Sequence, residues 1–157
     1  MKHYLITGLL ILSTAACSPM KQVEVVELLN HSSCQNLKAG ISETTLAKVG
    51  TLRQSRLLPP PDDAPVQPEQ QLPELEATRV FAISKGSQPT PGYAFSHEET
   101  VLDGDRVRVR LAWETPAAGA VLPQMLTHPC IVLGVPETGA KVLVAEDQGG
   151  AFAELPL

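Results

Sequence analysis

Residues 93–113 carry the pattern that most restricts the fold, which is two strand-like segments on either side of a turn. Tyr93–Leu102 and Arg106–Trp113 flank Asp103-Gly104-Asp105. An Asp-Gly pair between alternating apolar and polar residues is a strong hairpin signal. In the second segment the apolar side chains share one face and the arginines share the other. The pattern predicts two antiparallel strands with one buried face.

The length of the turn decides which residues face each other. A two-residue Asp-Gly turn would pair Val101 with Arg106 and place the apolar residues of the two strands on opposite faces. A three-residue loop gives one apolar face through the pairs Val101–Val107, Phe95–Trp113 and His97–Leu111. Because a slip of one residue turns every side chain to the other face, we expect the three-residue loop.

The other segments also favour strands. Strand-like runs are Val23–Leu29, Val80–Ser84, and a second hairpin of Cys130–Val135 and Lys141–Ala145 around residues 136–139. Leu37–Leu58 is weakly helical, and the 14 prolines disfavour long helices. We therefore predict a mainly β protein, with α+β as the alternative. Its form would be a small β-sandwich or open barrel built from antiparallel hairpins, with one or two short helices.

Composition suggests how the chain is divided. Residues 59–73 are rich in proline and polar side chains, which predicts an extended surface loop. We expect a single β-rich domain at 23–145 that contains this loop. The residues that follow, 146–157, include Gly149-Gly150 and are expected to form a frayed tail.

The N-terminus has the layout of a secretory signal that ends at a cysteine. Lys2 precedes the apolar run Leu5–Leu12, and small residues lead to Cys17. This arrangement resembles a bacterial lipoprotein signal, although Thr14 stands where leucine is usual; the alternative is an ordinary signal peptide beside a coincidental cysteine. We expect a signal peptide at 1–16, acyl chains such as palmitate on Cys17, and a tether at 17–22. Ser18 follows Cys17, and the absence of Asp at this position resembles lipoproteins that are sorted to the outer membrane. We therefore expect a bacterial outer-membrane lipoprotein that faces the periplasm.

Two cysteines remain if Cys17 carries the lipid. An even remainder in an oxidising compartment favours a disulfide between Cys34 and Cys130. The alternatives are a metal pair or two buried thiols, and no CxxC motif or His/Cys cluster supports the metal.

Charge and the scattered histidines exclude several function classes. Removal of Lys2 with the signal would change the net charge from −5 to −6, which disfavours nucleic acid as a partner. The sequence shows no motif that would bring together a nucleophile, a base and an orienting group. We therefore expect no catalysis, no metal and no cofactor.

The segment Gly86–Tyr93 is the candidate contact loop. Its prolines fix φ, its glycines permit unusual conformations, and a stiff loop loses little entropy on binding. The partner-binding residues that we expect are Gly86, Pro89, Thr90, Pro91, Gly92 and Tyr93. The alternative is a turn that only links two strands, with Tyr93 packed inward.

Gly86, Pro89, Thr90, Gly92 and Tyr93 fit the GxxPTGGY pattern of the PrcB family, which is named for a protease-complex subunit. The resemblance covers roughly residues 80–145 and includes the Pro-Cys strand entry at 129–130. Pro91 departs from the pattern, since glycine is usual there. The resemblance implies a non-catalytic envelope protein that binds another protein, as an accessory or stabilising subunit of a protease. The same turn is similar to the NPTTGY loop of chagasin-type inhibitors, which implies a protease inhibitor as the alternative.

Overall fold

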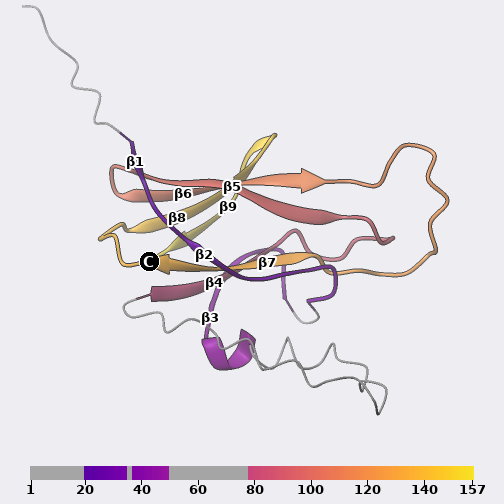
Figure 1. The fold of residues 1–157 in the computed structure, drawn as a ribbon, viewed down its shortest axis with the longest axis horizontal. Coiled ribbons are helices and arrows are strands. Elements are labelled where there is room, and N and C mark those ends of the chain that lie inside the picture. The colour runs from indigo at the N-terminus through magenta and orange to yellow at the C-terminus, as the bar shows by residue number, and fades with distance from the viewer. Residues whose placement is uncertain (1–19, 35–36, 50–77) are drawn as a thin grey trace, which may run out of the picture.

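Two sheets packed face to face make up nearly all of the regular structure (Figure 1). The computed structural model describes residues 20–34, 37–49 and 78–157. The predicted signal peptide, Cys17 and the Pro-rich loop at 59–73 lie outside these residues. Within them one short helix covers residues 46–49, and none of the described helical structure is long and apolar enough to span a membrane.

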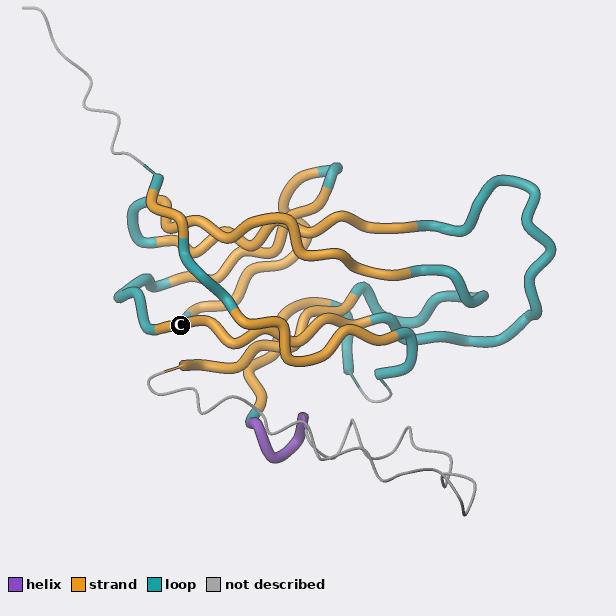
Figure 2. The backbone as a smooth tube through the Cα atoms, in the orientation of Figure 1, coloured by secondary structure: helices purple, strands orange, loops and turns teal. Residues whose placement is uncertain are grey.

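The sandwich has one five-stranded and one four-stranded layer (Figure 2). The first has the order β1 (Lys21–Gln22), β5 (Ala94–Asp103), β6 (Arg106–Glu114), β8 (Val142–Asp147), β9 (Gly150–Pro156). The second has the order β2 (Val26–His31), β7 (Cys130–Pro136), β4 (Thr78–Ser84), β3 (Gly40–Thr44). Neighbouring strands are antiparallel except for β6 and β8, which are parallel. The predicted mainly β sandwich is confirmed.

The main core lies between the two layers. The four-stranded sheet contributes Phe81, Ile83, Ile131, Leu133 and Val135, and the five-stranded sheet contributes Phe95, Val107, Val109, Leu111, Leu143 and Ala145. In both β4 and β7 the odd-numbered residues face this core. Burial of these side chains supplies the principal driving force that holds the two sheets together.

A second apolar cluster covers the outer face of β7. Val132 lies in this cluster with Leu28, Val49 and the disulfide between Cys34 and Cys130. β7 is thus buried on both faces, which explains its continuous apolar sequence. The predicted pairing of Cys34 with Cys130 is confirmed.

The β5–β6 hairpin forms with a different turn from the one expected. The pairs Phe95–Trp113 and His97–Leu111 are as predicted, but Val101 faces Arg108 instead of Val107. Gly104, with φ of 62°, begins a two-residue turn, and a bulge between His97 and Glu99 restores the register beyond it. Both strands keep one apolar face because the extra residue shifts the alternation of β5 by one position.

The second predicted hairpin is wrong. β7 and β8 both exist, but they belong to different sheets, and the connection at 137–141 crosses between them. β7 requires burial on both faces, which a place between β2 and β4 provides. β8 instead pairs in parallel with β6 and antiparallel with β9. Consecutive strands pair in most folds but not in all of them.

Both ends of the predicted domain are also corrected. Residues 150–156, expected to lie in a frayed tail, form β9, and its Leu155 packs against the main core. Lys21–Gln22, assigned to the tether, pairs with β5, and the first long strand begins at Val26 instead of Val23. The fold therefore extends beyond 23–145 in both directions.

The segment predicted as weakly helical contains a strand before its helix. β3 pairs along β4, and the helix at 46–49 follows Thr45, whose hydroxyl accepts a hydrogen bond from Lys48 N at 3.4 Å. A threonine at this position satisfies a free amide of the first turn. Residues 50–58 of that segment lie outside the described part of the chain.

Replacement of both Cys34 and Cys130 by serine should lower the free energy of unfolding by about 2–5 kcal/mol. The bridge joins residues 96 positions apart and restricts the unfolded chain accordingly. Urea unfolding with and without a reducing agent measures the loss. Reduction should weaken the native protein equally and leave the double variant unchanged; a native midpoint that ignores the reductant would contradict the prediction.

Candidate functional site

Two connections between the sheets meet at one end of the sandwich. Residues 85–93 lead from β4 to β5, and residues 115–129 lead from β6 to β7. Both lie at the same end because Ser84 pairs with Cys130 in one sheet and Ala94 pairs with Glu114 in the other. β1 lies at the opposite end, where Lys21 pairs with Leu102 near the β5–β6 turn. Figure 2 shows the longer connection extending well beyond the strands.

Hydrogen bonds join the two connections into one surface. Gln88 N donates to Thr127 O at 2.8 Å, and Thr127 N donates to Gln88 O at 2.9 Å. The Thr127 hydroxyl donates to Thr90 O at 3.0 Å, and Thr127 itself is only 5% exposed. The candidate loop is therefore braced along its length, whereas Ser87, Pro89 and Gly92 stay exposed to solvent.

Glycine is required at both ends of the loop. Gly86 has a φ of 79° and Gly92 a φ of 95°, conformations that residues with a side chain rarely adopt. A Cβ atom at Gly92 would also lie 3.2 Å from Cγ of Pro116, which belongs to the second connection. Because Gly92 takes the positive φ, proline at position 91 is compatible with the turn.

Tyr93 packs inward instead of extending as a free contact. Its ring stacks on Trp113 with centroids 5.6 Å apart, and the centroid of the Phe95 ring lies 4.7 Å from that of Trp113. Of the six predicted contact residues, Pro89 and Gly92 are exposed, while Gly86, Thr90, Pro91 and Tyr93 are half-buried. The tyrosine therefore anchors the loop.

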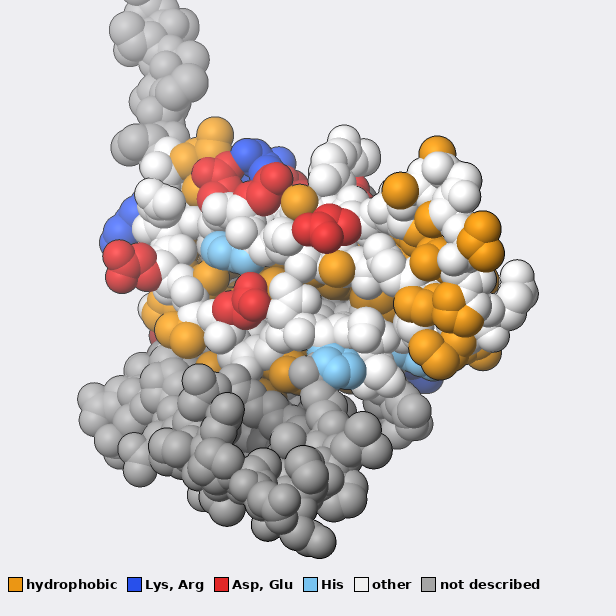
Figure 3. Space-filling model, turned by 45° about the vertical axis from the view of Figure 1, so that its right-hand side comes forward, with side chains coloured by type: hydrophobic (Ala, Val, Ile, Leu, Met, Phe, Trp, Pro, Cys, Tyr) orange, Lys and Arg blue, Asp and Glu red, His pale blue; other side chains and the backbone are white. Residues whose placement is uncertain are grey.

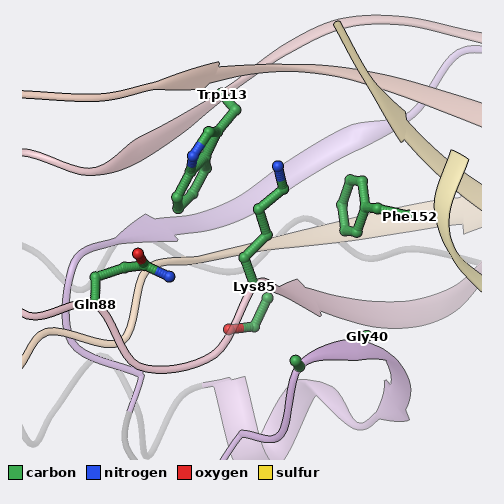
Figure 4. A pocket seen from close by; sticks show the side chains of 7 residues that line it. Gly40, Lys85, Gln88, Trp113 and Phe152 are labelled. Carbon is green, nitrogen blue, oxygen red and sulfur yellow. The ribbon is translucent and has the colours of Figure 1, made fainter. Parts of the chain in front are cut away.

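Lys85 fixes the base of the loop to the opposite sheet (Figure 4). Its ammonium lies 4.9 Å from the ring centre of Trp113 and 5.0 Å from that of Phe152, and it forms an ion pair with Asp147. The hydrogen bond from Lys85 lowers the pKa of the Asp147 carboxyl. We call Lys85 and its three partners, Trp113, Phe152 and Asp147, the Lys85 clamp. A cavity of about 430 Å³ lies beside it and is lined by Gly40 as well as by Lys85, Trp113 and Phe152.

Ser87 and His128 form a second side-chain contact between the connections. The Ser87 hydroxyl lies 2.8 Å from His128 Nε2. This is the spacing of a nucleophile and a base, but no described contact orients the other ring nitrogen of His128 as a catalytic triad requires. His97 is bonded to Thr100 at 2.9 Å. Among the described residues no group of three or more His, Cys, Asp or Glu side chains could hold a metal.

The sequence analysis missed the Lys85 clamp and the second connection, residues 115–129. Trp113, Asp147 and Phe152 lie on three different strands of one sheet, so no local pattern joins them to Lys85. The second connection did carry a signal, because residues 115–127 contain no charged side chain.

These features define a small β-sandwich whose crossing connections form a braced end. Residues 79–136 match the family described as PrcB C-terminal, so the predicted resemblance is confirmed for this part of the chain. The match extends from β4 to the end of β7 and includes both connections; it stops short of residue 145, the expected limit. No curated protein matches the chain significantly, and no solved structure does.

The Lys85–Asp147 pair predicts a specific pH dependence. Lys85→Met keeps the apolar stem between the rings but removes the charge. The Asp147 pKa is lowered in the folded protein from an unfolded value of about 3.9. The ion pair therefore stabilises fully above that value, and its contribution is lost as the pH falls through the folded pKa.

Urea midpoints of the native and Lys85→Met proteins should thus differ most near neutral pH, and the difference should shrink below about pH 4 to the contribution of the ammonium–ring contacts. Lys141→Met removes an exposed charge and serves as the control. A native–variant difference that stays constant with pH would contradict the assignment.

Proposed function

We propose that this protein is a non-catalytic envelope lipoprotein that binds another envelope protein, as an accessory subunit of a protease complex. The single observation that carries the proposal is the Gln88–Thr127 pairing, which turns two connections into one fixed surface. The PrcB C-terminal match supports an association with a protease complex. Signal-like residues before Cys17 support the lipid anchor.

The braced end is suited to recognition because little conformational freedom remains to be lost. Glycine conformations, the hydrogen bonds of Thr127 and the Tyr93–Trp113 stack define its shape before any partner arrives. Binding costs fall when a loop is already ordered. The exposed Ser87 and Pro89 remain available for contact.

Anchoring at Cys17 would present this surface away from the membrane. Met20 follows Cys17 by three residues, so a lipid there would hold the β1 end of the sandwich within about 11 Å of the anchored residue. β5 has ten residues and leads from that end to the braced end. At about 3.4 Å per residue the surface would stand roughly 30 Å further out.

The loop itself is tested by the double variant Ser87→Glu, Pro89→Glu. Both side chains are exposed, so the fold should be retained, while two added charges should reduce partner capture about tenfold or more. Tyr93 is left intact because its stacking on Trp113 is structural. Crosslinking in cells, with identification of the captured proteins, measures the effect.

The matched control is Gln22→Glu, Ser42→Glu, which adds the same charge at exposed sites outside the loops. It should capture partners as the native protein does. Undiminished capture by the loop variant, with an unchanged urea midpoint, would refute this role for the loop.

Protease inhibition is the second candidate function. It is favoured by the position of Pro89 at the exposed tip of a braced turn, a shape that fits a protease cleft. The purified domain would then reduce the peptidase activity of a cysteine protease such as papain in a dose-dependent manner. Ser87→Glu, Pro89→Glu would abolish that effect. Papain activity that is unaffected by the native domain would favour the accessory role.

The contact between Ser87 and His128 provides a test of the non-catalytic assignment. We expect the purified protein to hydrolyse neither peptide nor ester substrates, and Ser87→Ala or His128→Ala to change nothing. Turnover that disappears in both variants would overturn the assignment.

A further inference from the structure

The second connection presents apolar side chains to solvent at the braced end. Val121 is 100% exposed, Leu126 69% and Met125 55%. Residues 115–127 contain no charged side chain. Figure 3 shows hydrophobic side chains gathered on this side of the molecule. A contiguous exposed apolar patch on a small protein marks an interaction site.

The connection that carries the patch is held at both of its ends. Ala120 N donates to Ala117 O at 3.0 Å across a turn, and Gly119 has a φ of 80°. Pro116 contacts the Gly92 end of the candidate loop, and Thr127 closes the other side by pairing with Gln88. The exposed apolar side chains thus lie between two attached ends of the connection.

The chemistry of the patch favours a protein over a lipid surface. Segments that lie in a membrane interface are rich in Trp, Tyr, Lys and Arg, and residues 115–127 contain none of these. The net charge of −5 would be repelled by anionic lipids. β1, which the proposed anchor would precede, lies at the other end of the sandwich.

We propose that residues 115–126 insert into an uncharged, apolar groove on a partner protein. Because the connection extends beyond the strands, the complementary surface must be concave (Figure 2). Val121, Met125 and Leu126 supply the apolar contacts, and the exposed Ser87 and Pro89 of the neighbouring loop lie at the rim. This inference rests on the proposed function and adds the chemistry of the partner.

Site-specific photocrosslinking in the full chain tests the groove. A photoreactive phenylalanine analogue replaces Val121 or Leu126, and Gln22 at the opposite end serves as the control position. The expected result is an adduct with one protein from positions 121 and 126 and none from position 22. Mass spectrometry should map the partner's crosslinked peptide to apolar, uncharged residues. A phospholipid adduct, an adduct with a second copy of this chain, a charged partner peptide or no adduct would overturn the inference.

Substitutions at positions 121 and 125 test whether the adduct depends on apolar contacts with the partner or only on its proximity. With the analogue at position 126, Val121→Asp, Met125→Asp should reduce the adduct about tenfold or more, whereas Val121→Ile, Met125→Leu should retain it. Both pairs of side chains are exposed, so the urea midpoint should not change. Equal adduct yields from the two double variants would contradict the inference.

The same readout distinguishes this inference from the proposed loop function. If Ser87→Glu, Pro89→Glu leaves the adduct intact while Val121→Asp, Met125→Asp removes it, the groove inference stands and the role of the candidate loop fails. If only the loop variant removes the adduct, the loop function stands and the groove inference fails.

Discussion

The chain has to cross between its two sheets on either side of the β5–β6 hairpin, and both crossings fall at the same end of the sandwich. This follows from β4 and β7 lying side by side in one sheet while β5 and β6 lie side by side in the other. The main core enforces that arrangement, since Phe81 and Leu133 must face Val109 across the interior. The braced end is a consequence of how the core is shared between the sheets.

The main stabilising contacts at that end join elements that are distant in sequence. Lys85 connects the end of β4 to Asp147 on β8, and Thr127 connects the two crossings to each other. The disulfide lies directly behind, since Cys34 N also donates to His128 O at 2.8 Å. The braced end is therefore supported from both sheets, which explains how its two connections can keep a defined shape.

The sequence was most informative where the pattern is local. Alternation around Gly104 predicted β5 and β6, and their pairing was correct as far as His97, where the bulge displaced it. The cysteine count predicted the disulfide. Strand neighbours were not predictable in the same way, because the apolar runs of β7 and β8 do not indicate which sheet each strand joins.

The same distinction between local patterns and contacts of distant residues applies to the candidate site. The proline and glycine pattern predicted a stiff turn at 86–93, and the structure has a turn there with two glycines at positive φ and with Gln88 paired to Thr127. Tyr93 was expected at the contact surface, but its orientation depends on Trp113, which reaches it only through the register of β5 and β6. Lys85 had no signal of its own, since its aromatic neighbours come from β6 and from a strand that was predicted to be a tail.

Several backbone groups on the outer edge of β5 already have partners. β1 occupies only Leu102 and Val101, Val23 N donates to Thr100 O at 2.8 Å, and the Asn30 amide donates to Phe95 O at 2.7 Å, with the bulge in between. An incoming extended segment would find few free carbonyls there and a bent template. Edge-to-edge pairing between copies of the protein is thereby discouraged.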